Sequence, residues 1–221
     1  WGYERDFTVE QIHATLPKAR ELGFEWAVLD DGWQTNEGDW DIDLRKFPRG
    51  DVDMREFTAK VREQGMRPRL WLAPLAADPG SRGLHEHVDM LLLDKDGAFQ
   101  TVTWWNALTQ CPAYQPTIDF YVALTKKAIG EWGFEGIKLD GQHLNAVAPC
   151  HNPAHKHARP EDSVEGLATF WSAIYKAAHD ANPDAVVELC PCGTAFAFHN
   201  LPATDQYPSS DPLSSWQGRS K

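Results

Sequence analysis

The chain has 221 residues, enough for one sizeable domain, and its 42% hydrophobic and 24% charged residues are typical of a globular protein. A net charge of −11 argues against binding to nucleic acid or to an anionic membrane, because such contacts depend on clustered Lys and Arg. No apolar run is long enough for a transmembrane helix and no signal peptide is visible, so the sequence indicates no compartment.

Helices that end at a glycine or at Asn-Pro alternate with apolar, strand-like runs that end in polar residues. In chain order, the predicted elements are a helix over 8–22, a strand over 24–29, a helix over 53–64, a strand over 69–74, a helix over 116–132, a strand over 136–139, a helix over 163–181, a strand over 185–189 and a weaker strand over 204–210. The stretch 76–115 is expected to be a long connection, and 149–160 a second irregular loop.

This alternation predicts βαβ units and a parallel sheet, with polar side chains gathered at the carboxyl ends of the strands. We therefore expect an α/β fold of the (β/α)8 TIM-barrel class, whose active sites lie at that face. The alternative is an open doubly wound sheet, but no Gly-rich phosphate loop follows a predicted strand. Residues 1–221 are expected to form a single catalytic barrel domain that lacks part of the first strand and the last units, with about five or six strands present. Its open sheet edges predict poor solubility or inactivity in isolation.

Asp140 is the strongest candidate for catalysis, because it directly follows a predicted buried strand and is expected to point into the mouth of the barrel. Lys138 lies two residues earlier and therefore on the same face of the strand. A cation at that position favours the ionised carboxylate that a nucleophile requires. The alternative is a purely structural Lys–Asp pair.

Further carboxylates follow other predicted strands. Asp30 and Asp31 come after the first strand, where carboxylates suit vicinal sugar hydroxyls, a cap for the following turn, or a hard cation. Two adjacent acids cannot face the same side of a regular strand, so the strand is expected to end there. Asp211 lies in a Ser-Asp-Pro sequence that also fits an ordinary helix N-cap.

The chain has four cysteines, too few for a disulfide framework. One cysteine is followed by three histidines in a set able to bind Zn²⁺, namely Cys150, His151, His155 and His157. The spacing matches no standard zinc motif, so a solvated loop, or one that lines a substrate channel, is favoured, and no metal or other cofactor is predicted. A catalytic thiol at Cys190 or Cys192 would need a histidine partner that the sequence does not place.

Four motifs follow one another in a fixed order along the chain. They are Val-Leu-Asp-Asp-Gly-Trp at 28–33, Gly-Asp-Trp at 38–40, Gly-Met at 65–66 ahead of Leu-Trp at 70–71, and Ile-Lys-Leu-Asp-Gly at 137–141. This series resembles glycoside hydrolase family 36, the α-galactosidase and raffinose-synthase family, and also the related family 27. The ordered set is specific, although each motif alone is weak, and the resemblance runs along the whole chain.

The resemblance implies a retaining double displacement on a glycoside or oligosaccharide. It implies that Asp140 is the nucleophile of the family's Lys-x-Asp motif and that Asp211, with Trp216 after it, is the general acid/base that follows the sixth strand. It further implies that two adjacent acids bind the galactose 4- and 6-hydroxyls and that a lysine contacts ring hydroxyls. It also implies that tryptophans form walls of the sugar pocket and that a cysteine lies near the sugar. The residues that match these roles are Asp30, Asp31, Lys138, Trp71, Trp33, Trp40 and Cys190.

The chain also departs from the family. The usual Gly-rich run ending in Arg after the fifth strand is replaced by Cys-Pro-Cys-Gly-Thr-Ala-Phe at 190–196, which leaves recognition of the sugar 2-position open. Asp-Gly-Trp-Gln at 31–34 and Gln142 resemble the raffinose-synthase branch, so transfer to another sugar is an alternative to hydrolysis. A metal-dependent barrel hydrolase that uses Asp30, Asp31 and the His-rich loop is a third alternative. Homo-oligomerisation through the family's flanking β-domains is left open.

Overall fold

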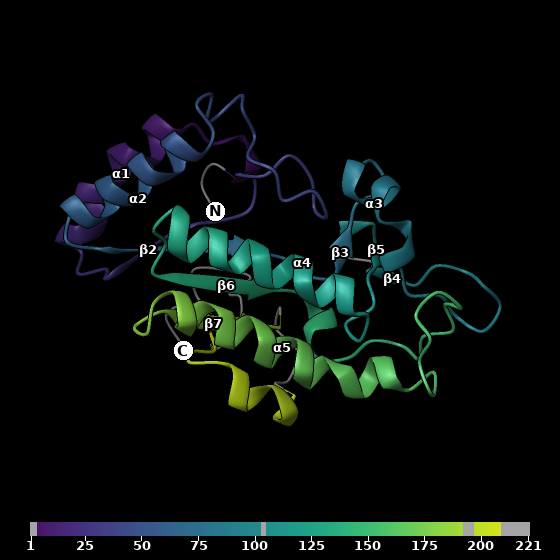
Figure 1. The fold of residues 1–221 in the computed structure, drawn as a ribbon. Coiled ribbons are helices and arrows are strands. Elements are labelled where there is room, and N and C mark those ends of the chain that lie inside the picture. The colour runs from purple at the N-terminus through teal and green to yellow at the C-terminus, as the bar shows by residue number, and fades with distance from the viewer. Residues whose placement is uncertain (1–3, 103–104, 192–196, 209–221) are drawn as a thin grey trace, which may run out of the picture.

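The structure is a computed structural model that describes residues 4–102, 105–191 and 197–208. Its centre is a parallel sheet with the strand order β1-β2-β6-β7 (Figure 1). The strands are β1 (Trp26–Leu29), β2 (Arg67–Leu72), β6 (Gly136–Asp140) and β7 (Val186–Cys190). Each strand overlaps its predicted range, and the helices between them make the sheet part of a (β/α)8 barrel, as predicted.

The main helices also match their predicted ranges, and they are α1 (Val9–Glu21), α2 (Asp51–Glu63), α4 (Gln115–Lys126) and α5 (Asp162–Ala181). Helix α1 begins with a capping box, in which the Thr8 hydroxyl accepts the N–H of Gln11 while the Gln11 side chain accepts the N–H of Thr8. Helix α4 continues as a π-helical turn over Lys127–Glu131. Figure 1 shows α4 and α5 side by side along the sheet. No helix within the described ranges is long and apolar enough to cross a membrane.

Alternation along the strands gives the sheet two different faces. One face is apolar and belongs to the main core, with Leu70, Leu72, Ile137, Leu139, Val187 and Leu189. The other carries polar and aromatic side chains, with Arg69, Trp71, Lys138, Asp140, Glu188 and Cys190. In the pairing register, Lys138 of β6 lies opposite Trp71 on one side and Glu188 on the other, and Asp140 lies opposite Cys190. Three neighbouring strands therefore deliver chemically active side chains to one place.

The weaker strand predicted over 204–210 is shorter than expected. Within the described residues it consists of one parallel bridge between Glu188 and Gln206, preceded by the 3-10 helix η6 (Phe198–Ala203). The side chain of Asp205 accepts the backbone N–H of Val187 over 2.9 Å, and so takes a donor that a regular strand would bind.

The long connection predicted over 76–115 has structure of its own. It forms an antiparallel sheet in the order β3-β5-β4 with two short helices, and its elements are β3 (Ala76–Ala77), α3 (Arg82–Glu86), η2 (Val88–Met90), β4 (Thr101–Val102) and β5 (Ala107–Thr109). Strands of two or three residues are too short to leave an alternation pattern in the sequence. Besides η6, the described residues outside the insertion contain the 3-10 turns η1 (Glu4–Asp6) and η5 (Gln142–Leu144). Because the insertion follows β2 directly, it lies at the carboxyl end of the sheet, beyond the ends of the barrel strands in Figure 1.

Candidate active site

Asp140 is the last residue of β6 and is 8% exposed. The indole N–H of Trp71 on β2 donates a hydrogen bond to its Oδ2 over 2.8 Å. The ammonium nitrogen of Lys138 lies 3.9 Å from the same oxygen. Both contacts come from strands of the central sheet, so the sheet helps to set the orientation of the carboxylate.

The ammonium of Lys138 lies between two carboxylates. It donates a hydrogen bond to Oδ2 of Asp30 over 3.0 Å and faces Asp140 on its other side. Burial lowers the pKa of Lys138, but the negative charges of Asp30 and Asp140 outweigh burial and raise the pKa above its ordinary value. Lys138 therefore stays protonated around neutral pH, and the predicted cation beside Asp140 is present.

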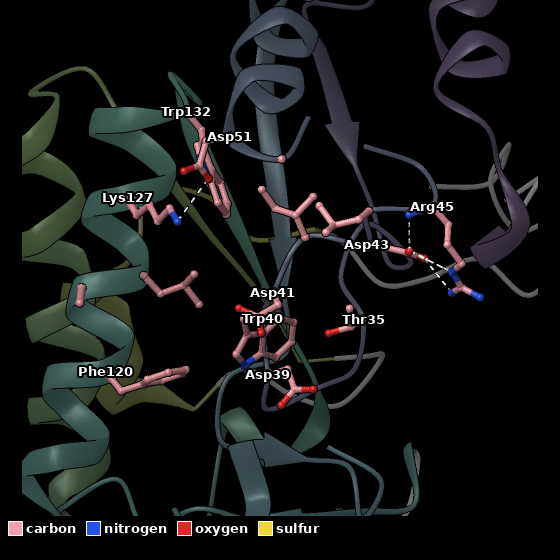
Figure 2. A pocket seen from close by; sticks show the side chains of 15 residues that line it. Thr35, Asp39, Trp40, Asp41, Asp43, Arg45, Asp51, Phe120, Lys127 and Trp132 are labelled. Carbon is pink, nitrogen blue, oxygen red and sulfur yellow. Dashed lines mark hydrogen bonds and ion pairs between the residues drawn. The ribbon is translucent and has the colours of Figure 1, made fainter. Parts of the chain in front are cut away.

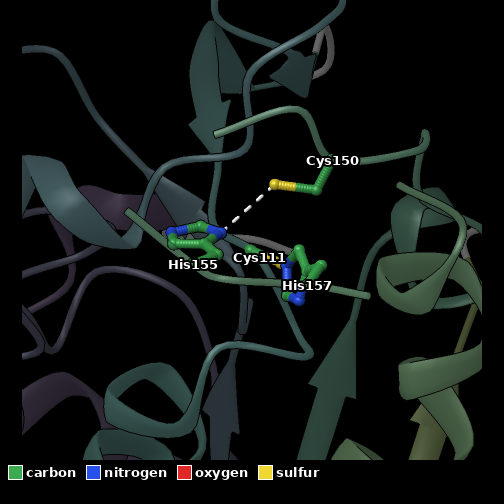
Figure 3. A group of neighbouring side chains, drawn as sticks. All are labelled: Cys111, Cys150, His155 and His157. Carbon is green, nitrogen blue, oxygen red and sulfur yellow. Dashed lines mark hydrogen bonds between the residues drawn. The ribbon is translucent and has the colours of Figure 1, made fainter. Parts of the chain in front are cut away.

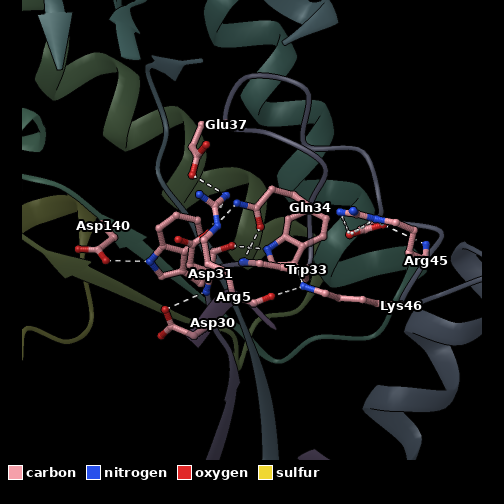
Figure 4. A network of polar contacts seen from close by, with 12 residues as sticks. Arg5, Asp30, Asp31, Trp33, Gln34, Glu37, Arg45, Lys46 and Asp140 are labelled. Carbon is pink, nitrogen blue, oxygen red and sulfur yellow. Dashed lines mark hydrogen bonds and ion pairs between the residues drawn. The ribbon is translucent and has the colours of Figure 1, made fainter. Parts of the chain in front are cut away.

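The two acids after β1 have different partners, and the strand ends before them as predicted. Oδ1 of Asp30 accepts the backbone N–H of Asp31 over 2.9 Å, while Oδ2 accepts the ammonium of Lys138. Asp31 instead accepts the amide of Gln34 over 2.8 Å and lies 3.4 Å from the guanidinium of Arg5 (Figure 4). The side chain of Asp30 is 53% exposed and that of Asp31 is 24% exposed. Asp30 is therefore the acid that is more open to a ligand.

The environment of Asp31 implies that stability depends on pH. Burial raises the pKa of Asp31, although the hydrogen bond from Gln34 and the charge of Arg5 act in the opposite direction. The folded chain therefore holds this proton more tightly than the unfolded chain. Consequently, the contribution of Asp31 to stability falls as the pH rises from the unfolded pKa of about 4 through the raised folded pKa.

We expect Asp31→Asn to raise the melting temperature of the full-length protein by a few degrees near neutral pH and by less near pH ~4, because the uncharged amide avoids this penalty. Thermal melts across that pH range measure the gain. Asp96→Asn, at an exposed carboxylate, is the control. A gain that shrinks toward neutral pH contradicts the assignment of burial as the dominant cause.

The three tryptophans predicted to line a sugar pocket are buried against one another. Trp33 is 0% exposed, and its indole N–H donates to the backbone oxygen of Trp71 over 2.8 Å. Trp33 therefore supports the backbone of Trp71, and its predicted contact with a sugar stays a prediction. Trp40 is 3% exposed, donates to the hydroxyl of Tyr121 over 3.3 Å and has its ring centroid 6.0 Å from that of Trp71. Of the three, Trp71 is the one whose indole N–H reaches Asp140.

Two aromatic side chains near Trp71 were missed by sequence reasoning. Trp105 packs edge-on against the Trp71 ring with centroids 6.2 Å apart, and His143 packs edge-on against Trp105 at 5.7 Å. Nε2–H of His143 donates to the backbone oxygen of Pro74 over 2.5 Å, and burial lowers the pKa of His143, so its ring is neutral at pH 7. The only available signal in the sequence was the pair of adjacent tryptophans at 104–105, because Trp71 and His143 are distant from Trp105 in sequence.

Cys190 ends β7 beside the candidate nucleophile. It lies opposite Asp140 in the pairing register, is 1% exposed, and its backbone oxygen accepts the N–H of Gly141 over 2.9 Å. Asp211, the predicted general acid/base, and Cys192 lie outside the described residues. The structure therefore brings Asp140, Lys138, Asp30, Trp71 and Cys190 together, and the position of the acid/base stays a prediction.

A buried ion pair between Arg69 and Glu188, also missed by sequence reasoning, lies beside Lys138, because Glu188 is directly opposite Lys138 in the pairing register. Burial raises the pKa of Glu188, and the charges of Arg69 and Lys138 oppose that effect. Arg69 also donates to Oε1 of Gln206 over 2.9 Å and lies 4.1 Å from the ring centroid of Trp26. This pair supports the candidate site from within the sheet.

A cavity of about 780 Å³ lies elsewhere, between the loop after β1 and helix α4 (Figure 2). Trp40 is its one lining residue from the predicted site. Carboxylates in its wall are engaged by neighbouring cations, with Lys127 3.2 Å from Asp51 and Arg45 2.7 Å from Asp43. We therefore place the candidate site at Asp140 and not in this cavity.

Comparison with solved structures identifies the fold of the chain. A GH36 α-galactosidase, AgaA from Geobacillus stearothermophilus, superposes with a TM-score of 0.78 at 23% identity, over 96% of this chain and 30% of that chain. TtGalA, an α-galactosidase from Thermus thermophilus solved in complex with stachyose, gives a TM-score of 0.75 at 23% identity, over 94% of this chain and 41% of that chain. Both support the assignment of the fold as part of a (β/α)8 barrel.

The Melibiase family model matches residues 2–211, and the chain belongs to that family. The resemblance to glycoside hydrolase family 36 is thereby confirmed. An "A type blood alpha-D-galactosamine galactosaminidase" from Flavonifractor plautii is 32% identical over 99% of this chain, and alpha-galactosidase AgaA from Geobacillus stearothermophilus is 35% identical over 85% of it. The chain spans 21% and 26% of the lengths of these two relatives.

Proposed function

We propose that this chain carries the catalytic centre of a retaining hydrolase for terminal α-linked galactose-type sugars. Asp140 is the nucleophile and Asp211 the general acid/base. The observation that carries the proposal is the setting of Asp140, a carboxylate fixed at the end of a barrel strand by Trp71 and faced by the ammonium of Lys138. The family to which the chain belongs supports the same reaction class.

The reaction proceeds in two displacements. In the first, an oxygen of Asp140 forms a bond to the anomeric carbon, while Asp211 gives its proton to the departing glycosidic oxygen. In the second, Asp211 takes a proton from water, and the resulting attack on the anomeric carbon breaks its bond to Asp140. Each step inverts the anomeric carbon, so the product keeps the α configuration. The ammonium of Lys138, 3.9 Å from Oδ2 of Asp140, places a positive charge beside the carboxylate that attacks in the first step.

The residues around Asp140 are proposed to bind the sugar. Asp30 and Asp31 accept hydrogen bonds from the 4- and 6-hydroxyls, and Lys138 contacts a ring hydroxyl. The half-exposed carboxylate of Asp30 supports this role, since it can exchange solvent contacts for a sugar hydroxyl. Trp71 and Cys190 are proposed to contact the sugar beside Asp140, and Trp33 and Trp40 hold Trp71 in place.

The sugar's 2-position is the point at which substrates are expected to differ. The relative from Flavonifractor plautii, which aligns with 99% of the chain, is named for an α-D-galactosamine substrate, and other relatives are named α-galactosidases. The chain also departs from the family pattern directly after Cys190. We therefore propose galactose or its 2-amino-2-deoxy analogue as the glycone.

Hydrolysis of p-nitrophenyl α-galactoside, α-galactosaminide and α-glucoside by the full-length protein tests this function. We expect at least one of the galacto-configured substrates to react about 10²-fold or more faster than the glucoside, because the 4-hydroxyl partners are left unpaired in the latter. The first sugar released, followed by NMR, is expected in the α configuration. Release of the β anomer, or a preference for glucoside, contradicts the proposal. Predominant transfer to an added acceptor sugar instead favours the transglycosylase alternative.

A further inference from the structure

A second group of chemically active side chains lies where the insertion at 76–115 meets the loop at 149–160 (Figure 3). Its members are Cys111, which follows β5, and three residues of the loop ahead of α5, namely Cys150, His155 and His157. The sequence interpretation of this loop as solvated is wrong for Cys150 and His155, because they are 3% and 8% exposed. The fourth member was not recognised from the sequence, because Cys111 lies in a different segment of the chain.

We propose that Cys111, Cys150, His155 and His157 bind one structural Zn²⁺ ion. Each residue offers one donor atom, and the four donor atoms lie within 4.8 Å of one another. Sγ of Cys111 is 3.3 Å from Nε2 of His157, and Sγ of Cys150 is 3.2 Å from Nδ1 of His155. Tetrahedral Zn²⁺, with Zn–S near 2.3 Å and Zn–N near 2.0 to 2.1 Å, separates a sulfur from a nitrogen by about 3.5 Å. Small adjustments therefore accommodate the ion.

The surroundings of the group are those of a metal centre. Nε2–H of His155 donates to the backbone oxygen of Asp89 over 2.5 Å, which leaves Nδ1 turned toward the sulfur of Cys150. Metal-bound histidines are held in this way by a second hydrogen bond. The ring of Tyr114 stacks on that of His155 with centroids 4.2 Å apart, and the hydroxyl of Tyr114 donates to the side chain of Asp89. The insertion thus orients a ligand that belongs to the loop.

The donor set also identifies the metal and its role. Two thiolates and two neutral imidazoles are soft to intermediate ligands, which suit zinc and not magnesium or calcium. Four protein ligands leave no open coordination position, so the ion is structural rather than catalytic. The group is separate from Asp30 and Asp31, which contact Lys138, Gln34 and Arg5, so the proposal does not rest on the barrel chemistry. The ion would fasten two long segments together at the carboxyl end of the barrel.

The test begins with the metal content of the full-length protein, purified without chelators and measured by inductively coupled plasma mass spectrometry. We expect Cys150→Ala and His157→Ala to lose about one equivalent of zinc relative to wild type. His151→Ala is the matched control, because His151 lies in the same loop, is exposed and is not a member of the group. It is expected to keep the full zinc content. Equal zinc in all four proteins overturns the proposal.

A second measurement on the wild-type protein covers the case in which the variants do not fold. After removal of zinc with a chelator, addition of Co²⁺ is expected to produce the intense visible bands and the thiolate charge-transfer band of tetrahedral cobalt. Their absence overturns the proposal. Mass spectrometry of non-reduced peptides gives an independent check, since a disulfide between Cys111 and Cys150 in the purified protein would exclude zinc binding by this set.

Discussion

Asp140→Ala is expected to lower kcat of the full-length protein on aryl α-galactosides by a factor on the order of 10⁴ or more, since loss of a nucleophile removes the covalent step. The fold is expected to survive the change. Asp140 lies at the end of its strand. Its oxygen Oδ2 accepts the hydrogen bond from the indole of Trp71 and lies near the ammonium of Lys138. The substitution therefore removes polar contacts but no core packing. Melting temperature and kcat are therefore measured together, and a large loss of kcat with little loss of stability is the expected pair of results.

Azide distinguishes a lost nucleophile from general damage to the site. The alanine variant leaves room beside the anomeric carbon, and a small anion that enters there restores turnover by forming the β-glycosyl azide. We expect this product from Asp140→Ala and none from wild type. Asp96→Ala is the control, because Asp96 is an exposed carboxylate in a turn and is distant from Asp140 in sequence. This variant is expected to behave as wild type. Near-normal turnover of Asp140→Ala without azide would sink the mechanism.

Arg69→Met is expected to lower the free energy of unfolding by about 3–5 kcal/mol, because it leaves the carboxylate of Glu188 buried without its partner. Arg69 is 2% exposed and Glu188 is 7% exposed, so little water is available to replace the lost charge. The same change also removes the hydrogen bond to Gln206 and the contact with Trp26. Chemical unfolding of the full-length protein, followed by tryptophan fluorescence, measures the loss.

Arg67→Met is a matched control on the same strand. Arg67 also lies over Trp26, at 4.2 Å, and pairs with Glu135 at 2.8 Å, but its side chain is 37% exposed. Exposed pairs contribute little, so we expect a cost of about 1 kcal/mol or less. The double change Arg69→Met/Glu188→Leu is expected to recover most of the loss, because neither charge of this pair is then left buried without the other. Equal costs for the two arginine changes would contradict the account.

Local signals in the sequence were sufficient for the central sheet and its helices. Glycine stops such as Gly23 and Gly65 marked the helix ends, and apolar runs marked the strands. The contact between Lys138 and Asp140 also followed from the sequence, because residues two apart on a strand share a face. The register between strands did not follow, and with it the pairing of Arg69 with Glu188 was missed.

What the sequence did not predict depends on contacts between distant segments. The hydrogen bond from the indole of Trp33 to the backbone oxygen of Trp71 joins residues 38 positions apart, and no local pattern in the sequence indicated it. Cys111 and Cys150 were separated by a helix and a strand, so no spacing rule connected them. The strands of the insertion were too short to produce a periodic pattern. Each of these features depends on contacts that only the folded chain makes.

The position of β6 between β2 and β7 separates two proposed tasks, cleavage of the bond and recognition of the sugar. Asp140 and Lys138 belong to a strand that is bonded on both sides, so the sheet holds the backbone of both residues in place. Asp30, by contrast, lies in the connection that follows β1. Residues in such connections tolerate change and carry specificity. A family built in this way can acquire new sugars while its bond-breaking step stays the same.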